Sequence, residues 1–392
     1  MKKYIPLCLV LSSILSLHLY AEKPRRFVEF GLDAGVGLAN NLTGVRDIMK
    51  KNIYLDLNSL SHSIKQGGVN LNTDIDTAVF FNFNMGEIWG FGISGGVEGA
   101  INGNIPKSIF TLITEGNINQ HVLEGDLTVF GSIFADAAID VHAKFGKLRV
   151  GIVPALYVPL IYIPKSTINY GLDSEERLYA WAESDIKVYS PFSLEDLDPS
   201  VVMQGSGFDL SLQGEYALLS MLDVGGTLSH IPLGGAVLHH QMRIYSEKIE
   251  INGDTLLTDQ NLNIPEFELK QEYTTGSYRV FRPLRFDVYA LWRPLRVDFF
   301  TIRPNIGFTH VLGEGIPPYF NAGLELRLNV LRVLFFHLGT GYEESLWKHR
   351  LGFALNLRIF ELDLEAGLRS QDLDKSFNLQ GASVKVGLRF GF

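Results

Sequence analysis

Carboxylate and guanidinium side chains recur in this chain at every second position, opposite apolar residues. In the segment 361–366, three acidic residues alternate with Leu362, Leu364 and Ala366. Charged groups that share one face can pair with each other or bind charged solutes. The candidates for such a polar face are Glu29, Asp33, Glu98, Asp136, Asp140, Arg279, Arg285, Glu325, Arg327, Arg350, Arg358, Glu361, Asp363, Glu365 and Arg369.

An arginine–proline motif occurs twice, at 282–285 and again at 293–296, each time after an aromatic residue. One interpretation is an arginine-lined wall that attracts anions or carboxylates. The other is a pair of turns at the rim of a membrane protein, where Arg reaches toward water and Trp anchors at the interface. We favour the rim for the second copy. Arg279 and Arg285 share a face with Asp287 and are better candidates for an interior.

Motifs of catalysis and cofactor binding are weak in this sequence. The string GxGxxG at 90–95 lies inside an alternating segment, not between a strand and a helix as dinucleotide binding requires. His239 and His240 are adjacent, so on a strand they point to opposite faces and do not easily share a metal ion. We therefore predict no cofactor, no metal and no enzyme. An enzyme whose residues are scattered over several strands remains an alternative.

The first residues resemble a secretory signal peptide. Lys2 and Lys3 precede a mostly apolar stretch at 5–17, and Ala21 offers a small residue for cleavage. We expect export and a signal peptide at 1–21. Its removal would take away Cys8, the one cysteine of the chain, which would exclude disulfides and thiol catalysis. The formal net charge of −9 argues against a nucleic-acid partner.

The elements that would position the charged residues are β-strands. In the segments 27–38 and 383–392, apolar residues occupy every second position, and small or charged residues lie between them. Such a strand has one apolar and one polar face. No window of 18 uninterrupted apolar residues follows the signal, so a membrane would be crossed by strands. The ending, with Phe390 and Phe392, resembles the C-terminal strand of bacterial outer-membrane β-barrels, where the terminal aromatic belongs to the insertion signal.

The connections between the predicted strands alternate between short and long, as in an up-and-down barrel with tight turns at one rim. We therefore predict an all-β fold, a transmembrane antiparallel barrel at 22–392 with about 14 strands. Its long loops would cover 40–68, 161–206 and 231–276. The segments 178–188 and 236–251 also alternate, and counting them as spanning strands gives 16. A secreted two-sheet sandwich is the alternative. The segments 47–51 and 106–115 are expected as short helices in loops.

The strand number, the helical stretch after the first strand and the run Gly-Leu-Ala-Asn-Asn at 37–41 resemble the long-chain fatty-acid transporter group of outer-membrane proteins. That group usually has an Asn-Pro-Ala turn after strand one, where this chain has Asn-Asn-Leu-Thr at 40–43. The layout is also similar to outer-membrane proteins of spirochaetes. The resemblance implies a barrel in the bacterial outer membrane, and no binding residue is carried over from it.

For function, the sequence favours a passive channel for small, hydrophobic molecules, with the segment 106–115 as a lid. The expected partners are the lipid bilayer, the outer-membrane barrel assembly machinery and a small solute of unknown identity. The alternative from another class is a structural or surface-recognition barrel that presents the loops 161–206 and 231–276. The charged interior has two interpretations, a salt-bridged plug or a transverse field in a pore. In a narrow barrel we favour the plug.

Overall fold

The structure is a computed structural model that describes residues 26–42, 62, 64, 66–86, 88–115, 122–173, 179–192, 205–252, 269–294, 299–313, 318–330, 333–377 and 380–392. The expected signal peptide at 1–21 and the expected helix at 47–51 lie outside the described residues. Within the described part, neither helix is long and apolar enough to cross a membrane.

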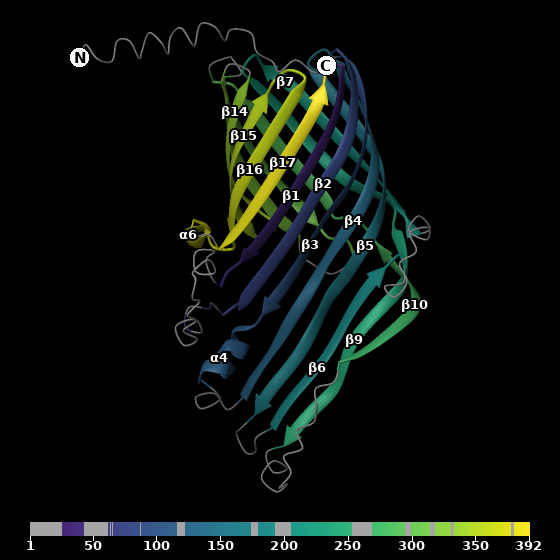
Figure 1. The fold of residues 1–392 in the computed structure, drawn as a ribbon, viewed down its shortest axis with the longest axis vertical. Coiled ribbons are helices and arrows are strands. Elements are labelled where there is room, and N and C mark those ends of the chain that lie inside the picture. Colours follow the sequence, from purple (N-terminus) through teal and green to yellow (C-terminus); the bar gives the residue numbers. More distant parts are fainter. Residues whose placement is uncertain are drawn as a thin grey trace, which may run out of the picture.

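The described residues form seventeen strands in one antiparallel sheet and two short helices (Figure 1). The strands are β1 (Val28–Asn40), β2 (Val69–Met85), β3 (Trp89–Ile105), β4 (Val122–Phe145), β5 (Leu148–Asp173), β6 (Tyr179–Ser190), β7 (Gly207–Leu219), β8 (Leu222–Gly234), β9 (Ala236–Asn252), β10 (Lys270–Val280), β11 (Leu284–Trp292), β12 (Phe300–His310), β13 (Tyr319–Val330), β14 (Leu334–Glu343), β15 (Leu346–Asn356), β16 (Phe360–Ser370) and β17 (Gly381–Gly391). The helices are α4 (Lys107–Glu115) and α6 (Leu373–Ser376). The predicted helix at 106–115 is therefore confirmed.

Fourteen strands of the described chain close into a barrel, because β1 pairs with both β2 and β17. Around the ring the order is β1 to β5, then β7, β8 and β11 to β17. At the closing seam, the backbone amides of Val28 and Phe392 each donate to the carbonyl oxygen of the other at 3.1 Å. The all-β barrel and the number 14 are confirmed. A sandwich would leave open edges that this ring does not have.

The remaining strands β6, β9 and β10 form a side sheet that lies outside the ring. The first half of β5 pairs with β7, and its second half pairs with β6. β9 then pairs with both β6 and β10. Figure 1 shows the side sheet extending beyond the barrel, away from the C-terminus. The ranges 161–206 and 231–276, expected as long loops, thus contain the far half of β5 and the side sheet.

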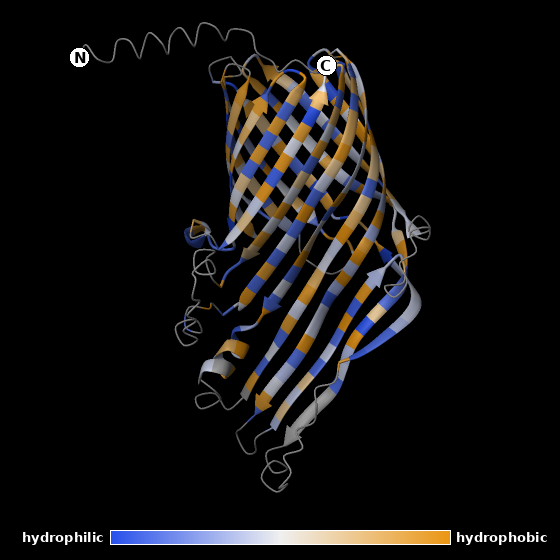
Figure 2. Ribbon diagram, in the orientation of Figure 1, coloured by the Kyte–Doolittle hydropathy of each residue, from blue (hydrophilic) through white to orange (hydrophobic). Residues whose placement is uncertain are grey.

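Alternation places apolar side chains on the outside of the barrel and polar ones inside. Figure 2 shows the hydrophobic and hydrophilic bands along each strand. On β1, the outward residues Phe30, Leu32, Val36 and Leu38 are 41–58% exposed. Contiguous exposed apolar rows are unfavourable in water, but a transmembrane barrel presents such a band to lipid. Trp89, Phe145 and Trp292 are exposed at the end with short turns, which matches an interfacial aromatic girdle.

A small core fixes the side sheet to the inner face of the barrel wall. Phe134, Tyr157 and Tyr162 of β4 and β5 pack against Ala236, Leu238 and Val280, which begin β9 and end β10. The Tyr157 hydroxyl donates to the carbonyl oxygens of Val280, at 3.1 Å, and Gly234, at 3.3 Å. This core draws the connections β8–β9 and β10–β11 toward the interior, where they place the side chains described next.

Candidate functional site in the barrel interior

The interior contains a cavity of about 690 Å³ with two kinds of lining. Aromatic and apolar side chains line part of it, namely Phe130, Phe134, Tyr162, Phe281, Pro283, Val311, Leu312 and Tyr319. These residues come from the half of the barrel with the long connections. The rest of the lining is mixed, and its charged side chains are Asp74, Asp76, Glu98, Arg285, Asp287, Arg303, Glu325, Glu343, Glu344, Lys348, Arg350, Glu365, Arg369 and Lys385. An apolar solute therefore finds a compatible surface in the first part.

A second cavity of about 390 Å³ lies toward the end with short turns. Its polar lining comprises Arg26, Glu29, Asn82, Asn84, Asp140, His142, Arg149, Gln213, Glu215 and Tyr289. Tyr289 borders both cavities, and its hydroxyl donates to Glu215 at 2.9 Å. The guanidinium of Arg303 lies over the Tyr289 ring at 4.3 Å. The two cavities thus follow each other along the barrel, and the lining of the second is mostly polar residues, with Val150 as an apolar one.

Arg282 is the centre of a buried ion cluster. It lies between β10 and β11, and only 3% of its side chain is exposed. Its Nε and Nη2 donate to the two carboxylate oxygens of Asp209 on β7 at 2.8 and 3.0 Å. Its Nη1 donates to Asp136 on β4 at 2.6 Å and lies 3.5 Å from Glu98 on β3. Bidentate and charge-assisted contacts of this kind hold a guanidinium firmly in place.

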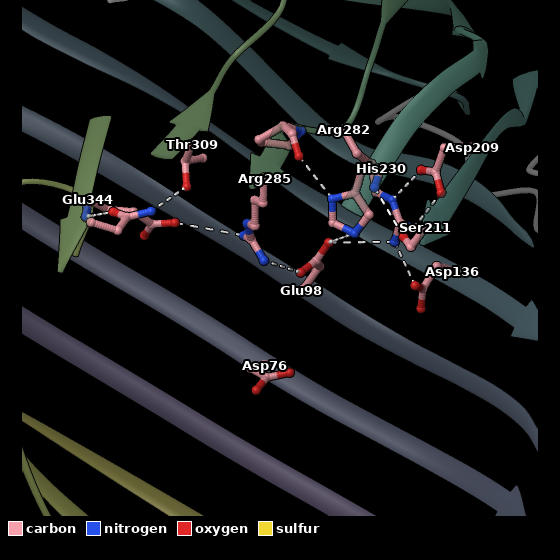
Figure 3. Close-up of polar contacts among 12 residues, drawn as sticks. Asp76, Glu98, Asp136, Asp209, Ser211, His230, Arg282, Arg285, Thr309 and Glu344 are labelled. Atoms are coloured by element: carbon pink, nitrogen blue, oxygen red, sulfur yellow. Dashed lines mark hydrogen bonds and ion pairs between the residues drawn. The ribbon is translucent and has the colours of Figure 1, made fainter. Parts of the chain in front are cut away.

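Arg285 extends this cluster across the interior (Figure 3). One end of its guanidinium lies 3.4 Å from Glu98, and the other lies 3.8 Å from Glu344 in the turn between β14 and β15. His230 stands beside Glu98, with Nε2 at 3.8 Å from the carboxylate. The main-chain φ of His230 is +60°, at a position where the β7–β8 register shifts. This irregularity ends the pairing of β8 with β11 at Ser229 and turns the chain inward.

A second group of ion pairs crosses the closing seam. Arg369 of β16 donates to Asp74 of β2 at 2.5 and 2.6 Å, with β17 and β1 lying between them. Lys385 of β17 donates to Asp76 of β2 at 2.9 Å. Arg389 contacts Glu361 at 3.0 Å and Asp33 at 3.6 Å. The seam is therefore joined by side chains as well as by backbone hydrogen bonds.

The structure brings together most of the residues that the sequence proposed for the interior. Glu98, Asp136 and Arg285 meet around Arg282, as described above. Arg26, at 3.3 Å from Glu29 and 3.7 Å from Glu361, joins these two acids. The remaining contacts are His337 with Glu365 at 2.9 Å, Arg350 with Glu343 at 2.8 Å, Arg327 with Glu325 at 2.8 Å and His142 with Asp140 at 3.6 Å. Asp363 is partly buried beside these groups.

Two proposed residues do not join them. Arg279 is exposed at the end of β10 in the side sheet, and it lines neither of the two cavities described above. Arg358 is exposed in the turn between β15 and β16, where its φ is +71° and its carbonyl oxygen accepts from Arg26. Arg293 contacts Asp223 at 2.7 Å, near a short turn.

Sequence reasoning missed the pairing of Arg282 with Asp209. The arginine–proline motif signalled Arg282, but its partners are 73 and 146 residues away in the chain. Asp209 was visible as a polar position in an alternating strand, without any sign that it would be 1% exposed. The segment 90–95 lies within β3. Within the described residues, no group of three or more His, Cys, Asp or Glu is placed to hold a metal ion.

A closed barrel with an apolar exterior and polar cavities inside has the architecture of transmembrane β-barrel channels. No protein-family model and no curated protein matches this chain. In fold it is similar to the P. putida toluene transporter TodX, with a TM-score of 0.51 and 11% sequence identity, over 95% of this chain and 91% of TodX. A TodX mutant described as a monoaromatic hydrocarbon channel matches with a TM-score of 0.50 and 9% sequence identity, over 94% of this chain and 91% of the mutant.

A FadL homologue from Pseudomonas aeruginosa also matches, with a TM-score of 0.45 and 9% identity, over 94% of this chain and 90% of that one. At these identities the likeness is one of fold. The likeness to TodX supports the barrel fold that the resemblance in the sequence implied.

Proposed function

We propose that this protein is a passive channel of the bacterial outer membrane that takes up small, hydrophobic molecules. The observation that carries the proposal is the aromatic part of the 690 Å³ cavity, at the end of the barrel with long connections. We call this part the aromatic mouth, defined by Phe130, Phe134, Tyr162, Phe281, Val311, Leu312 and Tyr319. Apolar solutes gain free energy on leaving water for such a surface, because binding removes apolar area from water.

The fold supports the proposal independently of the cavity. The outward rows on β1 and its neighbours suit a bilayer, and TodX, which shares the fold, is described as a toluene transporter. A small aromatic hydrocarbon is therefore the first solute to test. The proposal includes export with cleavage after Ala21, and barrel insertion with Phe390 and Phe392 as part of the signal. N-terminal sequencing of the membrane-fraction protein tests the cleavage, and replacement of both Phe residues by Ala tests insertion.

The proposal includes helix α4 as a lid over the mouth. It follows β3 directly and packs against β4, and the Ser108 and Tyr170 hydroxyls are hydrogen-bonded at 2.5 Å. Figure 1 shows α4 beyond the ring, on the side of the long connections. Its apolar residues Ile109, Phe110 and Leu112 offer a further surface to a hydrophobic solute.

Uptake of radiolabelled toluene by bacteria that express the protein tests the proposal. Phe130→Asp places a charge in the aromatic mouth and should abolish uptake, whereas Phe130→Leu keeps an apolar surface and should preserve it. Equal amounts of each variant in the outer membrane are the control. Uptake that is the same in cells with and without the protein would reject the channel.

A second candidate function is surface recognition, because the side sheet extends beyond the barrel (Figure 1). Replacing 161–206 and 231–276 by short turns removes β6, β9 and most of β10. A recognition protein would lose its binding activity, whereas a channel would keep conductance. Our proposal includes no catalytic step, and assays for esterase and protease activity on the purified barrel test that part.

A further inference from the structure

We propose that a row of ion pairs across the interior is the selectivity barrier of this channel, and that Arg285 is the residue that determines what it excludes. The row runs from Glu344 through Arg285 and Glu98 to Arg282, and ends at Asp136 and Asp209 (Figure 3). Hydrophobic solutes bind in the aromatic mouth, while hydrated solutes are stopped at the row. This inference rests on the proposed function, because it explains how a channel for apolar molecules avoids leaking polar ones.

The row reaches between distant parts of the ring. Glu98 lies on β3 and Arg285 on β11, with β4, β5, β7 and β8 between them in the wall. From Arg285 the row continues to Glu344 beyond β14, passing β12 and β13. Side chains from three separate sectors of the ring therefore meet inside it. A solute that travels along the barrel axis has to pass these groups.

The two ends of the row are fixed by buried hydrogen bonds. At one end, Arg282 and Asp209 are 3% and 1% exposed and share two hydrogen bonds. At the other end, the backbone amide of Glu344 donates to the side-chain oxygen of Asn321 at 3.1 Å. The side-chain amide of Asn321 in turn donates to Thr309 at 2.9 Å, and both of these residues are buried. The side chains of Arg282 and Asp209 and the backbone at Glu344 therefore cannot move without losing these contacts.

Arg285 differs from these ends in its freedom. Its side chain is 37% exposed and lines the cavity, and its carboxylate partners lie at 3.4 and 3.8 Å. These contacts are longer than the 2.6–3.0 Å contacts of Arg282. The row is therefore rigid at Arg282 and Asp209 and looser at Arg285. A change in the Arg285 side chain should alter the free cross-section with the least effect on the fold.

The position of the row relative to the aromatic mouth gives the barrier its selectivity. Phe134 of the mouth is the register partner of Glu98, so on this part of the wall the aromatic surface directly borders the row. An apolar solute gains free energy up to that level and loses it beyond, because charged groups would have to give up polar partners. A hydrated ion has no favourable surface in the mouth and meets paired charges at the row.

Ion conductance in planar bilayers tests the barrier, with Arg285→Met as the main variant. Methionine removes the charge and shortens the side chain, so conductance should rise about threefold or more if the row restricts the passage. The matched control is Arg327→Met. Arg327 is also an interior-facing arginine with a carboxylate partner, but that partner, Glu325, lies on its own strand at 2.8 Å. The control should conduct as the wild type does.

A second variant, Glu98→Gln, keeps the size of the side chain and weakens its attraction to Arg285, so it should raise conductance by a smaller factor. It decides the question if Arg285→Met fails to insert. If Arg285→Met conducts as the wild type does, the barrier is overturned. The same holds for wild-type conductance in Glu98→Gln if Arg285→Met does not insert. An equal rise in conductance in Arg327→Met would also overturn it. Toluene uptake is measured in parallel. Its absence in the wild type would reject the proposed function while leaving the conductance result intact.

Discussion

The inner wall of the barrel has two unlike regions. Strands β1, β2 and β3 contain no lysine or arginine, and β4 contains only Lys144 near its end. Over the same strands the interior positions include Glu29, Asp33, Asp74, Asp76, Glu98, Asp136 and Asp140. By contrast, the strands from β11 to β17 carry Arg285, Arg303, Arg327, Lys348, Arg350, Arg369, Lys385 and Arg389. The first region is acidic, and the second holds the basic residues.

The difference shows how the barrel closes. Five acids of the first region pair with basic residues at 282–389: Asp33 with Arg389, Asp74 with Arg369, Asp76 with Lys385, Glu98 with Arg282 and Arg285, and Asp136 with Arg282. An enclosed acid without a partner would be costly, and so would an enclosed base. The acidic wall therefore needs basic residues from outside it, and the closed ring brings them together.

Glycines on β1 make room for the pairs that cross the seam. A Cβ atom added at Gly37 would collide with the Arg369 guanidinium and the Asp74 carboxylate, which meet directly over this residue. At Gly35, the nearest side-chain atoms belong to Lys385, at 3.6 Å. The small residues between the apolar positions of β1 thus leave space for the side chains that pair across the seam.

The largest effect is expected from removing the charge of Arg282. Arg282→Met leaves Asp209 buried without its bidentate partner, which should lower the free energy of unfolding by about 3 kcal/mol or more. Urea unfolding in detergent micelles measures this change. Arg279→Met, at an exposed position three residues earlier, is the control and should change stability little. Equal stability of the two variants would show that the cluster does not hold the two walls together.

A side chain at Gly37 should have the next largest effect. Gly37→Val forces Arg369 and Asp74 apart, and we expect a loss of about 2 kcal/mol in the same assay. Gly214→Val on β7 is the control, because an added Cβ has no neighbouring atom within 4 Å there. In an Asp74→Asn background the cost of Gly37→Val should shrink, since the two changes share one contact. Additive losses would argue that the pair is not what Gly37 accommodates.

The architecture of these walls was largely predictable from sequence. Alternation at 27–38 and 383–392 identified β1 and β17 and the outward face of each, because a period of two fixes which side chains share a face. The same period does not identify the neighbouring strand. The segments 178–188 and 236–251 alternated as well, yet they form β6 and β9 in the side sheet. They lie outside the ring because β5 pairs with β7 along its first half and with β6 along its second half. Alternation within a strand does not indicate such a change of partner.

The ion clusters were predictable only as a polar face. Glu98 and Arg285 were recognisable as interior residues, but their contact joins positions 187 residues apart. Arg282 belongs to 281–283, a segment outside any strand, so no periodic pattern oriented it. Its position follows from the inward turn at His230 and from the packing of Val280 on Tyr157. These are tertiary contacts without a local signature.

A small effect on stability is expected from the exposed ion pair between Asp76 and Lys385, which also joins the two walls. Asp76 and Lys385 are 60% and 43% exposed, so water screens their attraction. Asp76→Asn should cost less than about 1 kcal/mol at low ionic strength. The difference should disappear near 1 M salt, where the Debye length is about 3 Å. A large loss that persists in high salt would mean that this pair, too, is part of the structural bridge between the walls.

The smallest effect is expected outside the ring, where neighbouring strands of the side sheet pair their own charges. Asp185 of β6 accepts a hydrogen bond from Arg243 Nε of β9 at 2.8 Å. Partial burial alone would raise the pKa of Asp185, but the hydrogen bond from Arg243 and the charges of Lys187 and Arg243 outweigh it and lower this pKa. The pair therefore stabilises the side sheet above the unfolded-state pKa of about 3.9, and this contribution is lost as the pH falls through the lower folded-state value.

Carbon NMR of the Asp185 carboxyl group, titrated from about pH 6 to pH 2, measures this pKa against the ordinary value near 3.9. Arg243→Gln should raise it, while Arg327→Gln on the barrel should leave it unchanged. Because Asp185 is 39% exposed and its partners lie on β6 itself and on the adjacent β9, losing the pair should loosen the side sheet without opening the ring. Unfolding of the whole barrel over the same pH range would instead mean that the side sheet and the two walls are one cooperative unit.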